Sequence, residues 1–342
     1  MVAAARYAYA HGRVSSRAGR LLSARGIEAL IDGSAQEEGV ILEETGWRAL
    51  DPETLGEPAA LEQALLDDLI GDALILARAL RGADRELLNY WVRRYELANL
   101  KAIIRGKMSG EAAEVIDLHL LTIGPFASLP VDELLRIDDV ASLLRRLEAT
   151  PFAEIGRGAL RVFEKKRERF ALDAALDRHY FMGLARRVKV ATGARDQDLR
   201  ALMGAIIDRL NLTWLLRYRY AYGLAPAEAY YLLIPGGYRL QDRRLGALAQ
   251  WTSIQDVIAH LPAALAGRLA GSVTAADVDR GMEREVWRVA GLALRRGALA
   301  VAEAFAYLVL RCGDMQKVHA VLRGKRLRLS PDRIRESIGP SV

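Results

Sequence analysis

A twelve-residue pattern that occurs three times constrains the fold of this 342-residue chain more than any other feature. The copies are residues 96–107, 208–219 and 314–325, and they align without a gap. Each begins with an acid, has a polar residue three places later, and has two adjacent aliphatic residues before an arginine. The three arginines are 112 and 106 residues apart. A repeat of this period predicts a chain built from three related structural units.

The apolar residues of the first copy predict a buried helix. Leu97, Leu100 and Ile104 share one face of a helical wheel, and Ile103 lies beside them. Small and aromatic residues cover the other side. Because a helix that is apolar nearly all round is normally buried, we expect the repeat to form the central helix of each unit.

The polar residues of such a helix need partners, because a lone buried charge is costly. We interpret them as structural anchors that pair within the helical core, for example Glu96 with Arg93 or Asn99 along the helix. A catalytic or ligand-binding set is the alternative. The anchors are Glu96, Asn99 and Arg105 in the first copy, Asp208, Asn211 and Arg217 in the second, and Asp314 and Arg323 in the third.

Each copy is followed by a break and by a second helix start, at Ser109-Gly110, Ala225-Pro226 and Ser330-Pro331. The first two copies share a further break, at Gly124-Pro125 and Pro235-Gly236, which the third copy does not reach. The other elements expected are helices over residues 6–24 (interrupted at Gly12 and Gly19), 59–80, 152–192 and 196–220, and a loop over 32–44.

Composition favours an all-α fold, since Ala, Leu, Arg and Glu dominate and alternating β-branched runs are absent. We expect three units, over residues 1–110, 111–222 and 223–342. The longest apolar stretch, 297–310, contains Glu303 and is shorter than the roughly 18 residues that span a membrane. No secretion signal is expected, and a single cysteine, Cys312, excludes an internal disulfide.

Several of these motifs, in this order, resemble the C subunit of the prokaryotic V/A-type rotary ATPases, which is a relative of the d subunit in the eukaryotic vacuolar enzyme. The resemblance covers essentially the whole chain. Two residues depart from the pattern: Lys317 stands where asparagine is usual, and Tyr218 where a small residue is usual. The matching features are Tyr7-Ala8-Tyr9 through Arg13, Arg20-Leu21-Leu22-Ser23, the helix with Glu96, Asn99, Leu100 and Arg105, Pro235-Gly236-Gly237-Tyr238, and Arg323-Gly324-Lys325.

The resemblance implies three helical units in a funnel about a pseudo-threefold axis. It implies a non-catalytic adaptor, peripheral to the membrane on its cytoplasmic face, between the central stalk of the ATPase head and the membrane rotor ring. Such an adaptor transmits torque, so that ATP turnover is coupled to proton or sodium transport. It implies no cofactor, no metal and no nucleic-acid partner.

The end of the chain is strongly basic. Residues 311–335 hold eight basic residues against two acidic ones, a surplus equal to the net charge of +6 of the whole chain. We expect Arg326, Arg328, Arg333 and Arg335 to contact an acidic partner protein or lipid headgroups. An ordinary solvated face is the plainer interpretation. A basic helical nucleic-acid-binding protein is the alternative function.

One motif is similar to that of an enzyme. Residues 67–72 (Asp-Asp-Leu-Ile-Gly-Asp) approach the aspartate-rich metal motif of helical isoprenoid enzymes, but the spacing is one residue too long and no second motif occurs. An exposed helix start is the plainer interpretation. The five histidines are scattered, and a phosphate-binding glycine-rich loop is absent. The sequence therefore indicates neither a catalytic site nor a cofactor or metal site.

Overall fold

The computed structural model describes residues 2–48, 50, 54, 57–166, 168–192, 196–296 and 300–338. Helices make up 78% of the structure, and the described residues contain no strand. The prediction of an all-α fold is therefore confirmed.

Six long helices pack in a closed ring. In order around the ring they are α5 (Pro58–Ala79), α6 (Gly82–Ser109), α11 (Arg169–Thr192), α12 (Gln197–Leu216), α17 (Ala275–Arg296) and α18 (Ala300–Arg326). Each packs against the next, and α18 packs against α5. Because α12 also touches α18, the ring is narrow on that side. The three repeat copies lie on α6, α12 and α18, every second member of the ring; the second copy ends in a π-helical turn, Arg217–Ala221.

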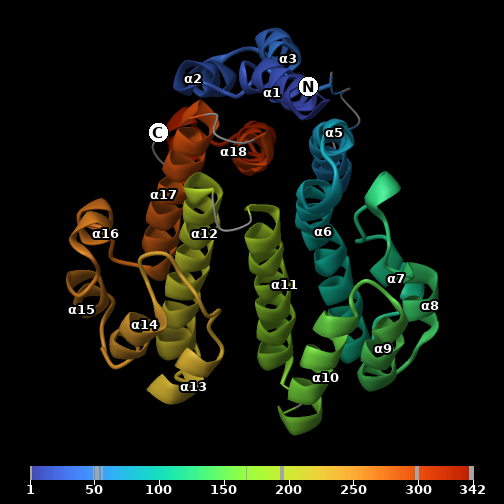
Figure 1. Ribbon diagram of the computed structural model, residues 1–342, viewed down its shortest axis with the longest axis vertical. Helices are drawn as coiled ribbons and strands as arrows, with labels where there is room; N and C mark the ends of the chain where they lie inside the picture. The colour runs from blue at the N-terminus through green and yellow to red at the C-terminus, as the bar shows by residue number, and fades with distance from the viewer. Residues whose placement is uncertain are drawn as a thin grey trace.

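The short helices form three groups outside the long ones (Figure 1). One group, at the top of the view, joins the N-terminal helix α1 to α2 and α3. The second, at the right, contains α7, α8 and α9, and the third, at the left, contains α13 to α16. Their bounds are α1 (Val2–Ala18), α2 (Ala24–Asp32), α3 (Ala35–Glu44), α7 (Ala113–Asp117), α8 (Val131–Arg136), α9 (Val140–Arg146), α13 (Pro226–Tyr231), α14 (Asp242–Leu248), α15 (Ile254–Ala259) and α16 (Ala263–Arg268).

The two ends of the chain lie together. The last helix, α19 (Pro331–Ile338), packs against α18 and α2, and α1 packs along α18. The first short helices therefore stand beside the last copy of the repeat, although about 300 residues separate them in sequence.

The expected helix starts after the repeats are confirmed: α7 begins at Ala113, α13 at Pro226 and α19 at Pro331. The first of these breaks is made by Gly110, whose φ of +73° is the left-handed conformation that ends α6.

Three predictions of local structure are wrong. The helix expected over 6–24 with an interruption at Gly12 is α1, which runs unbroken through Gly12 and ends at Ala18. The expected loop over 32–44 contains α3, which begins with a capping box between Ser34 and Glu37. Ser-x-x-Glu is a helix-start signal, and here it outweighs the glycine and the acids that favoured a loop. The expected single helix over 152–192 is two helices, α10 (Ala153–Lys166) and α11, which pack against each other.

Tyr218 stands where the other two copies have Gly106 and Gly324, and a smaller residue on the following helix makes room for it. In the third copy a Cβ on Gly324 would lie only 2.7 Å from Ile334 Cγ1 of α19, and a Cβ on Gly106 would meet Ile116 of α7 in the same way. In the second copy Tyr218 is buried and the facing helix α13 supplies Ala229. A larger residue on the repeat helix thus goes with a smaller one on the helix after it, as a close-packed core requires.

Candidate functional site

The acid of each repeat copy binds the backbone ahead of a short helix. Glu96 accepts hydrogen bonds from the N–H and hydroxyl of Ser128 and from the N–H of Leu129 (2.6 Å), just before α8. Asp208 accepts from three successive N–H groups, at residues 238–240, at 2.7–3.1 Å, just before α14. Carboxylates are stabilised at such positions because the N-terminal end of a helix has unpaired N–H groups and a partial positive charge.

The third acid takes its partner from the beginning of the chain. Asp314 accepts a hydrogen bond from Leu22 N–H at 2.9 Å, two residues before α2. Burial raises the pKa of Asp314 to about 6, although the Leu22 N–H and the charges of Lys317 and Arg311 act in the opposite direction. Burial also raises the pKa of Asp208, against the hydrogen bonds from its three N–H groups.

A cation eleven residues after each acid binds the other end of the same short helix. Lys107 Nζ donates to Leu135 O in the last turn of α8. Arg219 Nε donates to Ala249 O, at the end of α14, at 2.8 Å. Lys325 Nζ donates to Gly33 O, at the end of α2, at 2.6 Å. A cation at these carbonyls complements the negative end of the helix dipole.

Each repeat helix therefore holds one short helix by both ends, an arrangement that we call the end clamp. Its members are Glu96 and Lys107 on α8, Asp208 and Arg219 on α14, and Asp314 and Lys325 on α2. No role was predicted for the three cations. The signal was present, because a basic residue occurs at this place in all three copies.

The asparagines of the first two copies bind backbone reciprocally. Asn99 donates to Leu121 O and accepts from Leu121 N–H, both at 2.8 Å. Asn211 makes the same pair of bonds with Ile234, also at 2.8 Å. Lys317 replaces asparagine in the third copy, and its ammonium lies 4.2 Å from the centre of the Trp287 ring.

The arginines of the repeat point outward instead of into the core. Arg105, Arg217 and Arg323 are all exposed. The pairing expected along the first helix also differs, since Glu96 bonds to Ser128 and Leu129 while Arg93 lies 3.9 Å from Glu86. The structure thus brings the acids and asparagines together with their backbone partners and leaves the arginines apart from them.

The four arginines near the end of the chain do not form one uniform patch. Arg335 bonds to Glu28 at 2.8 Å and to Asp32 at 2.7 and 2.8 Å, which ties α19 to α2. Arg333 lies 3.2 Å from Glu336 on the same helix. Arg326 and Arg328 are exposed, and within the described part of the chain their guanidinium groups have no ion pair. These last two remain the arginines free for a partner.

Inside the ring lies a cavity of about 150 Å³, which is lined from α6, α11, α12, α17 and α18. Arg94 lies beside it, stacked 3.8 Å from the centre of the Trp91 ring and 2.8 Å from the sulfur of Cys312. A more open pocket of about 450 Å³, between α5, α6 and α18, shares Arg94, Cys312 and Gln316 with the inner cavity.

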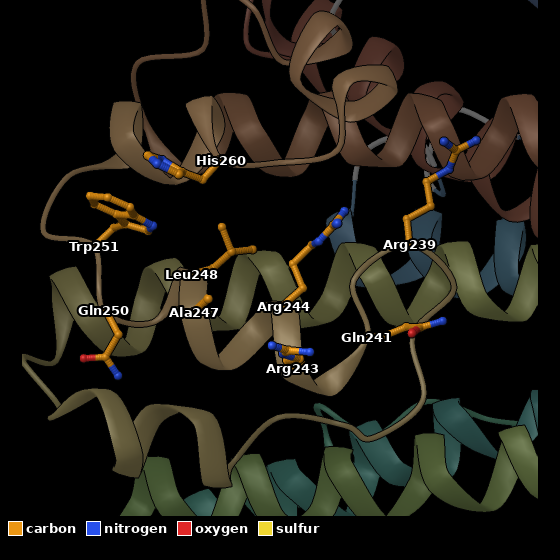
Figure 2. A pocket seen from close by; sticks show the side chains of 9 residues that line it. All are labelled: Arg239, Gln241, Arg243, Arg244, Ala247, Leu248, Gln250, Trp251 and His260. Carbon is orange, nitrogen blue, oxygen red and sulfur yellow. The ribbon is translucent and has the colours of Figure 1, made fainter.

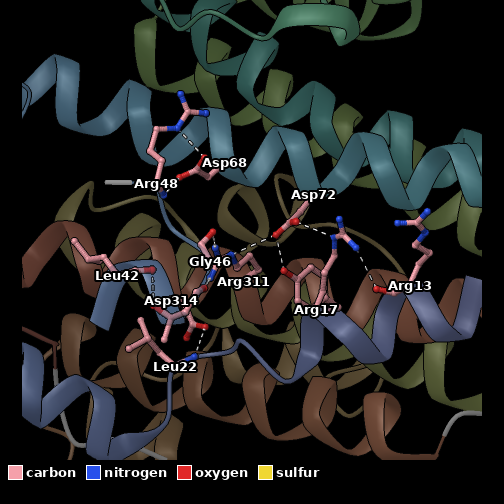
Figure 3. A network of polar contacts seen from close by, with 12 residues as sticks. Arg13, Arg17, Leu22, Leu42, Gly46, Arg48, Asp68, Asp72, Arg311 and Asp314 are labelled. Carbon is pink, nitrogen blue, oxygen red and sulfur yellow. Dashed lines mark hydrogen bonds and ion pairs between the residues drawn. The ribbon is translucent and has the colours of Figure 1, made fainter. Parts of the chain in front are cut away.

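The aspartates of residues 67–72 bind arginines (Figure 3). Asp68 accepts from the backbone and side chain of Arg48, both at 2.8 Å. Asp72 accepts from Arg17 at 2.9 Å and from Tyr307 at 2.5 Å, and the buried Arg311 lies 3.5 Å away. These acids join α1, α5 and α18. In the residues described, no group of three or more His, Cys, Asp or Glu side chains could hold a metal ion.

Among the residues with described positions, no helix has both the length and the apolar character needed to cross a membrane.

The comparisons with known proteins agree with the resemblance noted in the sequence. The chain is 26% identical to the C subunit of the A-type ATP synthase of Methanocaldococcus jannaschii, over 96% of this chain and 85% of the relative. It is 24% identical to the corresponding protein of Methanothermobacter thermautotrophicus, over 94% and 84%. The C subunit of the V-type ATP synthase of Deinococcus radiodurans is 28% identical over 60% of this chain and 58% of its own length.

The family described as "ATP synthase (C/AC39) subunit" matches residues 10–337, nearly the whole chain. The chain therefore belongs to this family, that of the C subunits of the A- and V-type ATP synthases.

Proposed function

We propose that this chain is a non-catalytic adaptor in the rotor of an A/V-type ATP synthase. It sits on the cytoplasmic face of the membrane, between the central-stalk subunits and the membrane rotor ring, and passes torque between them. The observation that carries the proposal is the closed packing of six long helices in a chain of this family. A closed ring resists twisting about its own axis better than an open row of helices, because no edge helix is free to move.

We further propose that the three units are related by a pseudo-threefold axis. Three equivalent end clamps support this arrangement, as does the alternation of the repeat helices around the ring. The expected division at residues 110 and 222 then needs one refinement. The third unit takes its clamped helix, α2, from the start of the chain, since Asp314 and Lys325 hold it.

The end clamps suit a torque-bearing part. They fix the short outer helices to the ring by charged hydrogen bonds at both ends, and these bonds are stronger than neutral ones. A partner that pushes on an outer helix therefore moves the ring with it. Close packing of the apolar interior adds stiffness.

The stalk docks at one mouth of the ring and does not pass through it. The inner cavity of about 150 Å³ is far too small for a helix, whose diameter with side chains is about 10–12 Å. The pocket of about 450 Å³ between α5, α6 and α18 is open, and Arg94 and Cys312 line both this pocket and the inner cavity. We propose it as the place where the stalk docks.

A pair of bulky substitutions tests this placement. Ala98 is exposed and lines the open pocket, so Ala98→Trp fills the entrance without disturbing the core. Ala264 is exposed on α16, outside the ring, and Ala264→Trp is the matched control. We expect Ala98→Trp to weaken the binding of purified central-stalk subunits, measured by calorimetry, and Ala264→Trp to leave it unchanged. Equal affinities for both variants would contradict docking at this mouth.

A further inference from the structure

The outer group formed by α14 and α15 carries a cavity that the proposed rotor function does not use. Its volume is about 910 Å³, and its lining includes Arg239, Arg243, Arg244, Trp251 and His260 (Figure 2). This volume lies within the range of small-molecule sites, about 300–1,000 Å³. In the described structure no acidic side chain is among the residues that line it.

The arginines of this cavity differ in their surroundings: the positive charge of Arg239 acts on the buried Asp208 and Glu285, and its guanidinium lies 5.8 Å from the centre of the Tyr238 ring. Arg239 is positioned by its backbone, which donates to Asp208 in the end clamp. Within the described residues, the side chains of Arg239, Arg243 and Arg244 form no hydrogen bond or ion pair. The nearby acids are engaged elsewhere: Asp242 accepts from Gly236 N–H, and Asp256 accepts from the Ser253 hydroxyl.

The equivalent place in the first copy has the opposite charge. Asp132 and Glu133 follow the clamped residue Leu129 by three and four positions, as Arg243 and Arg244 follow Leu240. Glu133 bonds to Arg146 at 2.6 Å, which closes the space between α8 and α9 with an ion pair. Counted from the helix N-caps, Asp139 and Ser253, the residue that corresponds to Arg146 is His260. The second copy therefore has arginine where the first copy has the acid of this pair, and histidine where the first copy has its arginine.

We propose that the cavity between α14 and α15 binds a phosphate-bearing anion. Guanidinium groups hold phosphate oxygens by paired, charge-assisted hydrogen bonds, and several of them together select for multiple negative charges. Arg244 lies between Arg239 at one end of the cavity and the stacked rings of Trp251 and His260 at the other, with 3.8 Å between the ring centres. This arrangement suits an elongated ligand with phosphates at the arginines and an apolar or ring portion at Trp251.

The test uses the isolated full-length chain, so its result does not depend on the rotor assignment. Binding of inorganic pyrophosphate and of ATP without magnesium is measured by calorimetry at low and physiological salt. Binding of phosphatidylglycerol vesicles is measured by co-sedimentation, which distinguishes a lipid headgroup from a free phosphate compound. We expect at least one of these probes to bind, more weakly as salt rises.

The decisive variant combines Arg243→Asp with Arg244→Glu, which copies the residues of the first unit. Both arginines are exposed, so we expect the thermal unfolding of this variant to match that of the parent. Its affinity for the bound probe should fall by about tenfold or more. The control combines Arg78→Glu with Arg81→Glu, which changes the net charge equally at another exposed place, and it should bind as the parent does.

Three outcomes would overturn the proposal: no binding of any probe, equal loss of binding in the charge-matched control, or undiminished binding in the Arg243→Asp/Arg244→Glu variant. Binding of an acidic peptide alone, with none of the phosphate probes, would also overturn it and would make this surface a protein contact.

Discussion

At the scale of single residues, the buried amide of Asn99 is expected to stabilise the fold strongly. Replacing Asn99 with Ala leaves both backbone groups of Leu121 without their side-chain partner, at a cost of about 1–3 kcal/mol in the free energy of unfolding. Arg105 is exposed and donates only to Lys101 O of its own helix, so Arg105→Ala should change stability by less than about 0.5 kcal/mol. Urea denaturation measures the free energy of unfolding of both variants. Equal losses of stability would show that Asn99 and Arg105 do not differ in this way.

Asp314 gives the protein a pH dependence of predictable sign. Its pKa of about 6 lies above the ordinary value of 3.8, so the folded chain holds this proton more tightly than the unfolded chain does. The stabilisation from the protonated group is present below pH 3.8 and is lost as the pH rises to about 6. Asp314→Asn should remove about 3 kcal/mol of this change. The variant should still show a smaller dependence of stability on pH, because the pKa of Asp208 is also raised. Identical pH profiles of stability for parent and variant would refute this effect.

At the scale of elements, the contact between a repeat helix and the helix after it depends on complementary volumes. Gly106→Ala should push α7 away through Ile116 and cost about 1–3 kcal/mol. Adding Ile116→Ala, the residue type that the second copy has at Ala229, should recover part of that loss. The two changes should therefore be non-additive in a double-mutant cycle of unfolding free energies. Strict additivity would show that the two residues do not share a contact.

The elements also show which structure could be predicted from sequence. The helix starts at Pro226 and Pro331 depend on signals a few residues long, and they were predicted correctly. The start of α3 depends on an equally local signal, Ser34 with Glu37, which was overlooked. The end clamps are different, because Glu96 and Ser128 are 32 residues apart and Asp314 and Leu22 are 292 apart. The spacing of residues along one helix cannot predict which distant backbone groups its side chains will bind.

At the scale of the whole molecule, the composition predicted the all-helical fold, but the sequence did not predict how the ring of long helices closes. The ring closes where α18 packs against α5, and α1 and α2 also pack on α18, although nothing in residues 2–32 matches the repeat. Only the structure shows that α1 and α2 contact α18, the helix that carries the third copy of the repeat. The sequence also does not separate the arginines of the basic end: Arg335 bonds to Glu28 and Asp32, whereas Arg328 has no ion pair with any residue whose position is described.

The rotor assignment is tested most directly by fixing this chain to the membrane rotor ring in an assembled enzyme. We propose that the acidic partner of the basic end is the rotor ring. Arg328 is exposed there, so Arg328→Cys provides the attachment point for a cross-linker. Two parts of one rotor turn together. The account therefore predicts that a product with the ring protein forms and that the cross-linked enzyme hydrolyses ATP at the rate of the untreated enzyme, still coupled to ion transport. If the link to the ring stopped hydrolysis, or if the chain cross-linked only to stationary parts of the enzyme, it would not be part of the rotor.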